Sequence, residues 1–201
     1  MNTQPKIDEL EYCLAKEFDY HLNLCVPNVT WGLRKLGHEC DLLVLRKSGH
    51  ACEIEIKRSL ADLKAEKEKR HTHESQMIRE FWYAIPEEIL EKAVEHIPDR
   101  AGILLYRKTE KQFSVLDARG GWRKVQKEVI VFTRKRQPKP NRSARKFTDA
   151  ERQKLLELAA MRVWSMKRKF AKLTNDQQSP TPATPSDLCS RLRRSEPGVA
   201  G

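Results

Sequence analysis

The sequence has no run of eighteen or more apolar residues and no apolar leader segment at its N-terminus. A membrane-spanning helix needs about 20 such residues, so we expect a soluble, unexported, cytoplasmic protein with no membrane partner. Its five cysteines form no Cys-x-x-Cys pair. We expect Cys40 and Cys52 to be small, buried hydrophobic residues in a reducing compartment. No internal repeat is visible, so the 201 residues are expected to form one domain with an appendage.

Acidic residues are scarce in one part of the chain. The net charge is +11, yet residues 1–133 contain 22 Lys/Arg and 22 Asp/Glu, which cancel. Residues 134–172 contain 14 Lys/Arg and only three acids, and residues 173–201 contain three of each. A basic stretch of this kind is typical of contact with the phosphate backbone of nucleic acids. Docking to an acidic protein partner is the alternative.

Residues 40–57 have the pattern of a short β-hairpin. The apolar run 40–45 is followed by turn residues, and residues 51–57 alternate strictly between polar and apolar. A three-residue loop that ends at Gly49, in the left-handed conformation, would pair Arg46 with His50. This turn predicts the register of the whole hairpin.

That register predicts two acids opposite each other. Counting inward from the turn, Asp41 falls opposite Glu55. Opposed Cβ atoms on one face lie about 4.5–5.5 Å apart, and two acids that close favour a divalent metal between them. Lys57 shares the face of Glu55, whereas Cys40 and Cys52 are expected on the opposite, apolar face.

An Asp with Glu-x-Lys on the adjacent strand resembles the signature of the PD-(D/E)xK nuclease superfamily. Over about residues 7–107, the chain is similar to the MmcB-like DNA-repair proteins and related phage and bacterial proteins. The blocks that carry the resemblance are Val26-Pro27-Asn28-Val29-Thr30-Trp31-Gly32, His38-Glu39-Cys40-Asp41, Glu53-Ile54-Glu55-Ile56-Lys57, Ser59-Leu60-Ala61-Asp62, Lys69-Arg70-His71-Thr72-His73 and Tyr83-Ala84-Ile85-Pro86.

The expected fold class is α/β, with a restriction-endonuclease-like αβββαβ core and a mixed central sheet. The periodicity predicts helix 7–21, strands 24–31, 40–45 and 51–57, helix 59–70, strand 81–85, helix 86–97 and strand 101–106. Strands separated by a helix are expected to be parallel neighbours with a right-handed crossover.

The C-terminal part is expected to be an addition to this core. Residues 112–117 and 125–133 suit a further hairpin around Gly120-Gly121, which closes a nuclease-like domain over 1–133. A basic linker or arm (134–147), a basic amphipathic helix (148–173) and a disordered tail (174–201) are expected to follow. The apolar face of that helix predicts that it packs on something.

The resemblance implies that Asp41, Glu55 and the Ile56 backbone carbonyl hold Mg²⁺ or Mn²⁺, which prefer oxygen ligands. It also implies that Lys57 acts beside the scissile phosphate, either on the attacking water or on the developing charge. The alternative is a solvated strand face with ordinary Glu–Lys pairs.

The roles of four other acids have alternatives that the sequence does not decide. Glu53 lies on the same face and suits either a second metal or a salt bridge. The superfamily often places one more acid on the opening helix. The resemblance favours Glu11, whereas a helical wheel favours Glu17, and Glu11 is taken as the candidate. Glu39 falls opposite Lys57, where it would orient that lysine or form a plain ion pair.

The nucleic-acid contacts are expected from basic residues and from a His-x-His pair that lacks partners for a zinc site. The candidates are Lys69, Arg70, His71, His73, Arg134, Lys135, Arg136, Arg142, Arg145, Lys146, Lys167, Arg168 and Lys169. Among the tryptophans, Trp122 is the candidate for base stacking.

These residues predict a metal-dependent DNA endonuclease in repair, recombination or the defence of mobile elements. A non-cleaving nucleic-acid-binding module and an RNA-directed nuclease are the alternatives, because backbone contacts carry no base sequence. One site per chain suits either nicking or a homodimer.

Overall fold

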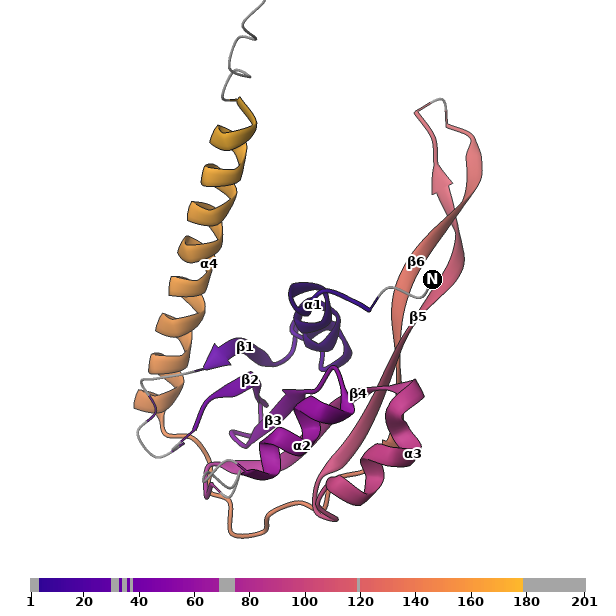
Figure 1. Cartoon of the computed structure of the whole chain (residues 1–201). Coiled ribbons are helices and arrows are strands. Elements are labelled where there is room, and N and C mark those ends of the chain that lie inside the picture. Colours follow the sequence, from indigo (N-terminus) through magenta and orange to yellow (C-terminus); the bar gives the residue numbers. More distant parts are fainter. Residues whose placement is uncertain are drawn as a thin grey trace, which may run out of the picture. The chain divides into compact units, whose positions relative to one another are not determined.

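The computed structural model in Figure 1 describes residues 4–29, 33, 36, 38–68, 75–118 and 120–178. Its contacts divide the chain into two units, residues 1–159 and residues 160–201, and each is considered by itself. Among the described residues, no helix has both the length and the apolar character needed to cross a membrane. The predicted tail covers 174–201, but the C-terminal helix continues to Gln178, and residues 179–201 lie outside the described residues.

Six strands form one sheet in the first unit and follow one another across it in chain order. They are β1 (Leu24–Val29), β2 (Cys40–Leu45), β3 (Ala51–Ile56), β4 (Ile78–Pro86), β5 (Gly102–Leu116) and β6 (Trp122–Arg136). The pairs β3–β4 and β4–β5 are parallel, and the other three pairs are antiparallel. The predicted α/β class with a mixed sheet is confirmed.

Helical segments join the parallel strands. Between β3 and β4 lies α2 (Leu60–Glu68), where Ser59 Oγ accepts a hydrogen bond from the Asp62 amide at 3.1 Å, as its capping pattern predicts. Between β4 and β5, three short pieces replace the predicted helix 86–97: η1 (Glu87–Ile89), α3 (Leu90–Ala93) and η2 (Val94–His96). Only one side chain of these pieces, that of Ala93, is buried. Packing therefore does not stabilise a longer, regular helix here.

Two apolar clusters of buried side chains cover the two faces of the sheet. On one face, α1 (Ile7–Glu17) buries Leu10 and Leu14 against side chains of β2, β3 and β4. The predicted helix 7–21 ends early, because Asp19 has a positive φ of 54°. On the other face, α2, α3 and the first turns of the C-terminal helix bury Leu63, Ala93 and Leu155.

The hairpin between β2 and β3 has the predicted turn and register. Arg46 N donates to His50 O at 3.0 Å, Gly49 has a φ of +84°, and Leu42 pairs with Ile54. Continuing that register by one residue puts Asp41 opposite Glu55. Local turn chemistry thus brings the two acids to neighbouring strands.

The long strands β5 and β6 form a second hairpin, which contains the predicted 112–117 and 125–133 strands. Its inner half completes the sheet, whereas its outer half is exposed and extends beyond the body of the first unit (Figure 1). The separate strand predicted over 101–106 is therefore the first part of one continuous strand.

Residues 134–147 are not a free linker, contrary to the prediction. Residues 134–136 belong to β6, and the amides of Lys139, Asn141 and Phe147 donate to carbonyls of Arg100, Arg79 and Gly49 at 2.8–2.9 Å. Ala144 and Phe147 are buried. The reason is that backbone groups of β4, β5 and the hairpin turn accept these hydrogen bonds, which no local sequence pattern indicates.

The C-terminal helix α4 (Asp149–Gln178) begins in the first unit and continues into the second. Leu155 and Leu158 are buried in the first unit, so the predicted packing of its apolar face is met there. Leu156, Met161, Val163 and Trp164 are exposed, so the apolar face that packs is narrower than predicted.

Candidate functional site

The predicted catalytic residues lie together at the C-terminal end of β3. Asp41 Oδ2 accepts a hydrogen bond from the Ile56 amide at 2.7 Å, and Lys57 Nζ lies 3.1 Å from Glu55 Oε2. Glu55 and Lys57 are only 5% and 4% exposed. The Glu–Lys pair of the alternative prediction is thus present, but the strand face that carries it is buried rather than solvated.

The backbone around Lys57 is held by two further strands. Lys57 N donates to Ala84 O of β4 at 2.9 Å, and Tyr106 Oη of β5 donates to Lys57 O at 3.3 Å. These contacts fix the lysine just past the last paired residue of β3. The ammonium itself is buried and pairs with Glu55.

Glu53 is fully buried on the same face, since it pairs with Leu43 and Phe81, both of which belong to the cluster beneath α2. Its Oε1 lies 2.8 Å from His38 Nε2. His38 is the residue that sequence reasoning missed, and its spacing from Glu53 carries no local signal. Glu39, by contrast, is exposed, so its predicted role toward Lys57 has no contact to support it.

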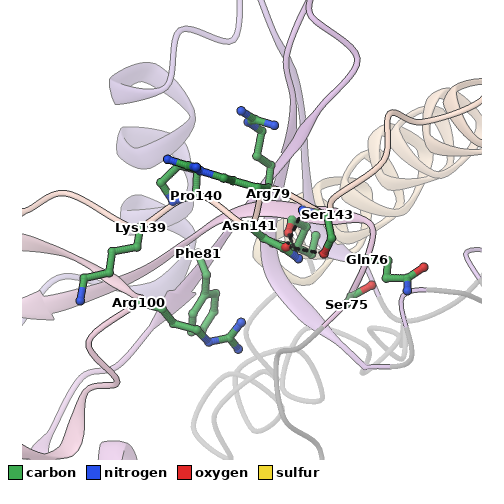
Figure 2. A pocket seen from close by; sticks show the side chains of 11 residues that line it. Ser75, Gln76, Arg79, Phe81, Arg100, Lys139, Pro140, Asn141 and Ser143 are labelled. Atoms are coloured by element: carbon green, nitrogen blue, oxygen red, sulfur yellow. Dashed lines mark hydrogen bonds between the residues drawn. The ribbon is translucent and has the colours of Figure 1, made fainter.

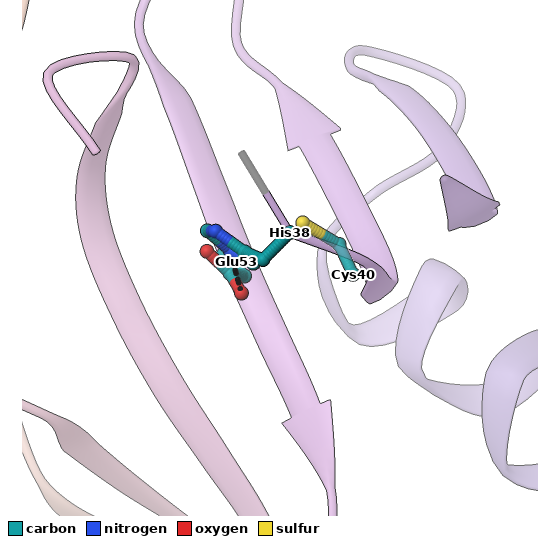
Figure 3. Close-up of side chains that lie close together, drawn as sticks. All are labelled: His38, Cys40 and Glu53. Atoms are coloured by element: carbon teal, nitrogen blue, oxygen red, sulfur yellow. Dashed lines mark hydrogen bonds and ion pairs between the residues drawn. The ribbon is translucent and has the colours of Figure 1, made fainter. Parts of the chain in front are cut away.

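Cys40 lies with the acids rather than on the apolar face where alternation put it (Figure 3). The cause is a break in β1: Asn28 has a φ of +51°, and Val26 and Val29 consequently share one face. Val29 pairs with Cys40, which turns to the same side. Cys52 lies on the opposite face, as predicted.

The pKa of the Cys40 thiol depends on its burial and on the acids around it. Burial raises its pKa, and the carboxylates of Glu53, Glu55 and Asp41 raise it further. Three buried or half-buried acids therefore share one small volume, with Lys57 as a counter-charge. Such a negative potential favours binding of a cation.

Two donor sets of different chemistry stand side by side here. Asp41 and Glu55 offer carboxylate oxygens, which suit Mg²⁺ or Mn²⁺. One ligand atom each of His38, Cys40 and Glu53 lies within 4.8 Å of the others, and nitrogen and sulfur suit softer metals such as zinc.

The two acids weighed on the opening helix have different surroundings. Glu11 Oε1 accepts a hydrogen bond from Asn28 Nδ2 at 2.8 Å, and Asn28 lies opposite Asp41 between the paired positions of β1 and β2. Glu17 instead forms an ion pair with Arg134 at 3.0 Å. Glu11 is thus the acid connected to the candidate site.

The predicted nucleic-acid contacts divide into several groups. Arg136 donates to the carbonyls of Ala101 and Pro98, and Arg145 forms a bidentate pair with Glu151. Both side chains therefore have partners within the fold, which for Arg136 are distant in sequence and for Arg145 lie six residues further along the chain. Lys69, Arg70, His71 and His73 lie outside the described residues.

The other predicted contacts keep exposed side chains. They are Arg134, Lys135, Arg142 and Lys146 in the first unit and Lys167, Arg168 and Lys169 in the second. The Lys167 Nζ atom lies 5.0 Å from the centroid of the Trp164 ring. Trp122, the stacking candidate, is 75% exposed at the start of β6.

No family model matches the chain, and no curated protein matches it. Among solved structures, the chain is similar to the SPO1766 protein of unknown function from Silicibacter pomeroyi. The identity is 18%, the TM-score is 0.47, and the match covers 91% of this chain and 100% of that chain.

Proposed function

We propose that the protein is a metal-dependent nuclease of the PD-(D/E)xK type that hydrolyses DNA phosphodiester bonds. The observation that carries the proposal is the joint position of Asp41, Glu55 and Lys57 at the end of β3, in a buried acidic environment. The similarity to MmcB-like proteins in the sequence blocks supports DNA repair, recombination or mobile-element defence as the setting.

The residues present fit a divalent cation. Asp41, Glu55 and the Ile56 carbonyl would hold Mg²⁺ or Mn²⁺, because all three offer hard oxygen ligands on adjacent positions. The buried Glu53 carboxylate on the same face of β3 adds further negative charge beside these ligands. When bound, the metal would lower the pKa of a water molecule and polarise the phosphoryl oxygen.

The chain itself would supply position and charge. The Ile56 amide orients the Asp41 carboxylate, and the neighbouring strands hold the Lys57 backbone. The Lys57 ammonium would neutralise the charge that develops on the phosphoryl oxygens or orient the attacking water. Glu55 Oε2 lies 3.1 Å from this ammonium and would help to hold it in place.

The direct test is cleavage of labelled DNA and RNA substrates with Mg²⁺, Mn²⁺ or EDTA. Asp41→Asn keeps the shape of the side chain but removes its charge, and we expect cleavage to fall by at least about 10²-fold. Lys57→Met should have a similar effect. Glu110→Gln, which changes an exposed acid on β5, is the control for net charge.

Equal rates for Asp41→Asn and the parent chain would refute the proposal. Tight binding without cutting under every metal would favour a nucleic-acid-binding module on the same scaffold. Preferential cutting of RNA would change the substrate class and leave the residue roles intact. Equilibrium sedimentation with and without DNA would then distinguish a nicking monomer from a homodimer.

A further inference from the structure

A second polar cavity lies in the first unit, away from the acidic cluster (Figure 2). It has a volume of about 520 Å³ and is formed by residues just before and at the start of β4, by Arg100 two residues before β5, and by the segment that follows β6. Its lining includes Arg79, Phe81, Arg100, Lys139 and Arg142. The predicted nucleic-acid contacts included only the last of these.

The charges of this cavity have one sign. Four cationic side chains line it, and the described lining residues include no carboxylate. Some basic side chains elsewhere in the first unit have acidic partners, as in the pairs Arg46–Glu80 and Arg134–Glu17. Arg79 and Arg100 have no such partner among the described residues, and a cavity of this kind attracts an anion.

A cation of the cavity also affects the pKa of a neighbouring histidine. Burial lowers the pKa of His50, and the charges of Arg79 and Lys146 lower it further. The cationic surface therefore extends from the cavity toward the β2–β3 turn. The segment 139–147 connects the two places, because Lys139 N donates to Arg100 O beside the cavity and Phe147 N donates to Gly49 O in the turn.

Backbone hydrogen bonds hold the cations around the cavity. Lys139 N donates to Arg100 O at 2.9 Å, and Asn141 N donates to Arg79 O at 2.8 Å. The Asn141 side chain accepts from the amide and hydroxyl of Ser143, which shapes the turn that presents Arg142. The Arg100 guanidinium lies 5.9 Å from the centroid of the Phe81 ring. The backbone that carries these four cations is therefore fixed, and the ring contact holds the Arg100 side chain.

The sheet register relates this cavity to the candidate active site. Glu53 pairs with Phe81 and Glu55 pairs with Tyr83, so the cavity begins two residues along β4 from the partner of Glu55. At about 3.3 Å per residue, Phe81 and Arg79 lie roughly 7 and 13 Å along the strand from that point. For a duplex whose axis runs along β4, with a rise of about 3.4 Å per nucleotide, this corresponds to about two to four nucleotides.

We propose that the cavity lined by Arg79, Arg100, Lys139 and Arg142 is a subsite for backbone phosphates of nucleic acid, about two to four nucleotides from the bond that is cut. The proposal rests on the proposed nuclease function for the position of that bond, whereas phosphate binding itself does not depend on cleavage. Arginine forks match phosphate oxygens, and the buried Phe81 offers no open face for a base, so contact is to the backbone.

The first test measures binding without cutting, in EDTA, by fluorescence anisotropy of a labelled DNA duplex at several salt concentrations. The variant Arg79→Gln/Lys139→Gln/Arg142→Gln keeps Arg100, whose ring contact supports the core. We expect it to flatten the slope of log K against log salt by about 2–3. The control Arg123→Gln/Lys124→Gln/Lys127→Gln removes the same charge from exposed positions of β6 and should leave the slope near that of the parent chain.

Equal losses in both variants, or no loss in either, would overturn the subsite. Circular dichroism and thermal melting of each variant would show that its fold is kept. Competition by a deoxynucleoside triphosphate distinguishes the source of the phosphate. Micromolar binding of that nucleotide, lost in the cavity variant, would identify a small-molecule site and overturn the nucleic-acid proposal.

The second test uses cleavage. Neutral methylphosphonate linkages are placed one at a time along the DNA strand, and we expect kcat/KM to fall when they lie two to four nucleotides from the cut. The cavity variant should lose this sensitivity. If the chain cuts nothing, the nuclease proposal fails while the anisotropy test still decides the subsite. Sensitivity at other positions alone would overturn the predicted spacing.

Discussion

Asn28 changes the chemistry of the candidate site through its backbone rather than its side chain alone. Its left-handed conformation, which Asn tolerates better than most residues, interrupts the alternation of β1. The paired residue Cys40 then faces Glu53 and His38 instead of the opposite apolar cluster. The same Asn28 connects Glu11 to this end of the sheet. The backbone conformation of one residue is thus linked to which possible metal-ligating side chains lie close together.

Gly102 is a residue at which close packing admits no side chain. A Cβ atom there would lie 2.5 Å from Cε3 of Trp82, which is buried in the sheet core. We predict that Gly102→Ala lowers the free energy of unfolding by about 1–3 kcal/mol, because the indole ring must shift in a packed core. Urea denaturation followed by circular dichroism measures this change.

Gly121→Ala is the matched control for that substitution. Its Cβ atom would meet the half-buried carboxylate of Asp117 in the turn between β5 and β6, a side-chain end rather than a ring packed in the core. We expect a change within about 0.5 kcal/mol. If Gly102→Ala were as stable as this control, the close approach of Trp82 would be wrong.

At the scale of elements, the start of α4 is held by a complete capping box. The Glu151 amide donates to Thr148 Oγ1 at 3.3 Å, and the Thr148 amide donates to Glu151 Oε2 at 2.9 Å. Arg145 adds a bidentate ion pair with Glu151. This cluster fixes the direction in which α4 leaves the segment 139–147, and it positions Leu155 for burial.

The ion pair with Arg145 and the capping hydrogen bonds lower the pKa of Glu151 from 4.5 to about 2. A lowered folded-state pKa stabilises the fold above the unfolded value, and this stability is lost as the pH falls from about 4.5 toward 2. We predict that Glu151→Gln lowers the free energy of unfolding by about 1–3 kcal/mol at pH 7. The difference from the parent chain should shrink below pH 4.5 in denaturation curves.

Glu157→Gln serves as the comparison in the same helix. Its pair with Lys154 is largely exposed, so solvent screens the interaction and we expect little change at any pH. A pH-independent loss for Glu151→Gln would mean that the capping geometry, not the charge, stabilises the helix start.

At the scale of the whole molecule, the chain consists of two units joined within one continuous helix. The candidate active site and the cationic cavity both lie in the first unit, whose contacts extend to residue 159. Deletion of the whole basic segment 134–172 would therefore also remove β6 residues and the buried Phe147. A cut after residue 159 is the informative truncation.

We predict that the chain ending at Ala159 keeps its fold and any nuclease activity but binds DNA with a weaker salt dependence. Residues 160–172 carry five Lys/Arg and no acid, and each cation that contacts a phosphate contributes about 0.9 to the slope. Anisotropy titrations and thermal melting measure the two effects. An unchanged slope would mean that the second unit makes no phosphate contact, and an unfolded product would contradict the division at residue 159.

Short-range patterns in the sequence were sufficient for several features. The Gly49 turn sets the register that opposes Asp41 and Glu55, and Thr148 and Glu151 form the cap of α4. These interactions join residues a few positions apart, or strands joined by one tight turn. The same locality explains why the element order and the mixed sheet could be predicted from periodicity.

Only the tertiary structure decided which partner each charged or polar side chain would meet. His38 with Glu53, Arg136 with carbonyls near Ala101, and the cations of the cavity come from segments far apart in the chain. Alternation misplaced Cys40 because one left-handed residue on a neighbouring strand reversed its side. The sequence states the charge of each side chain. Its partner depends on how distant segments pack together, and no local pattern encodes that packing.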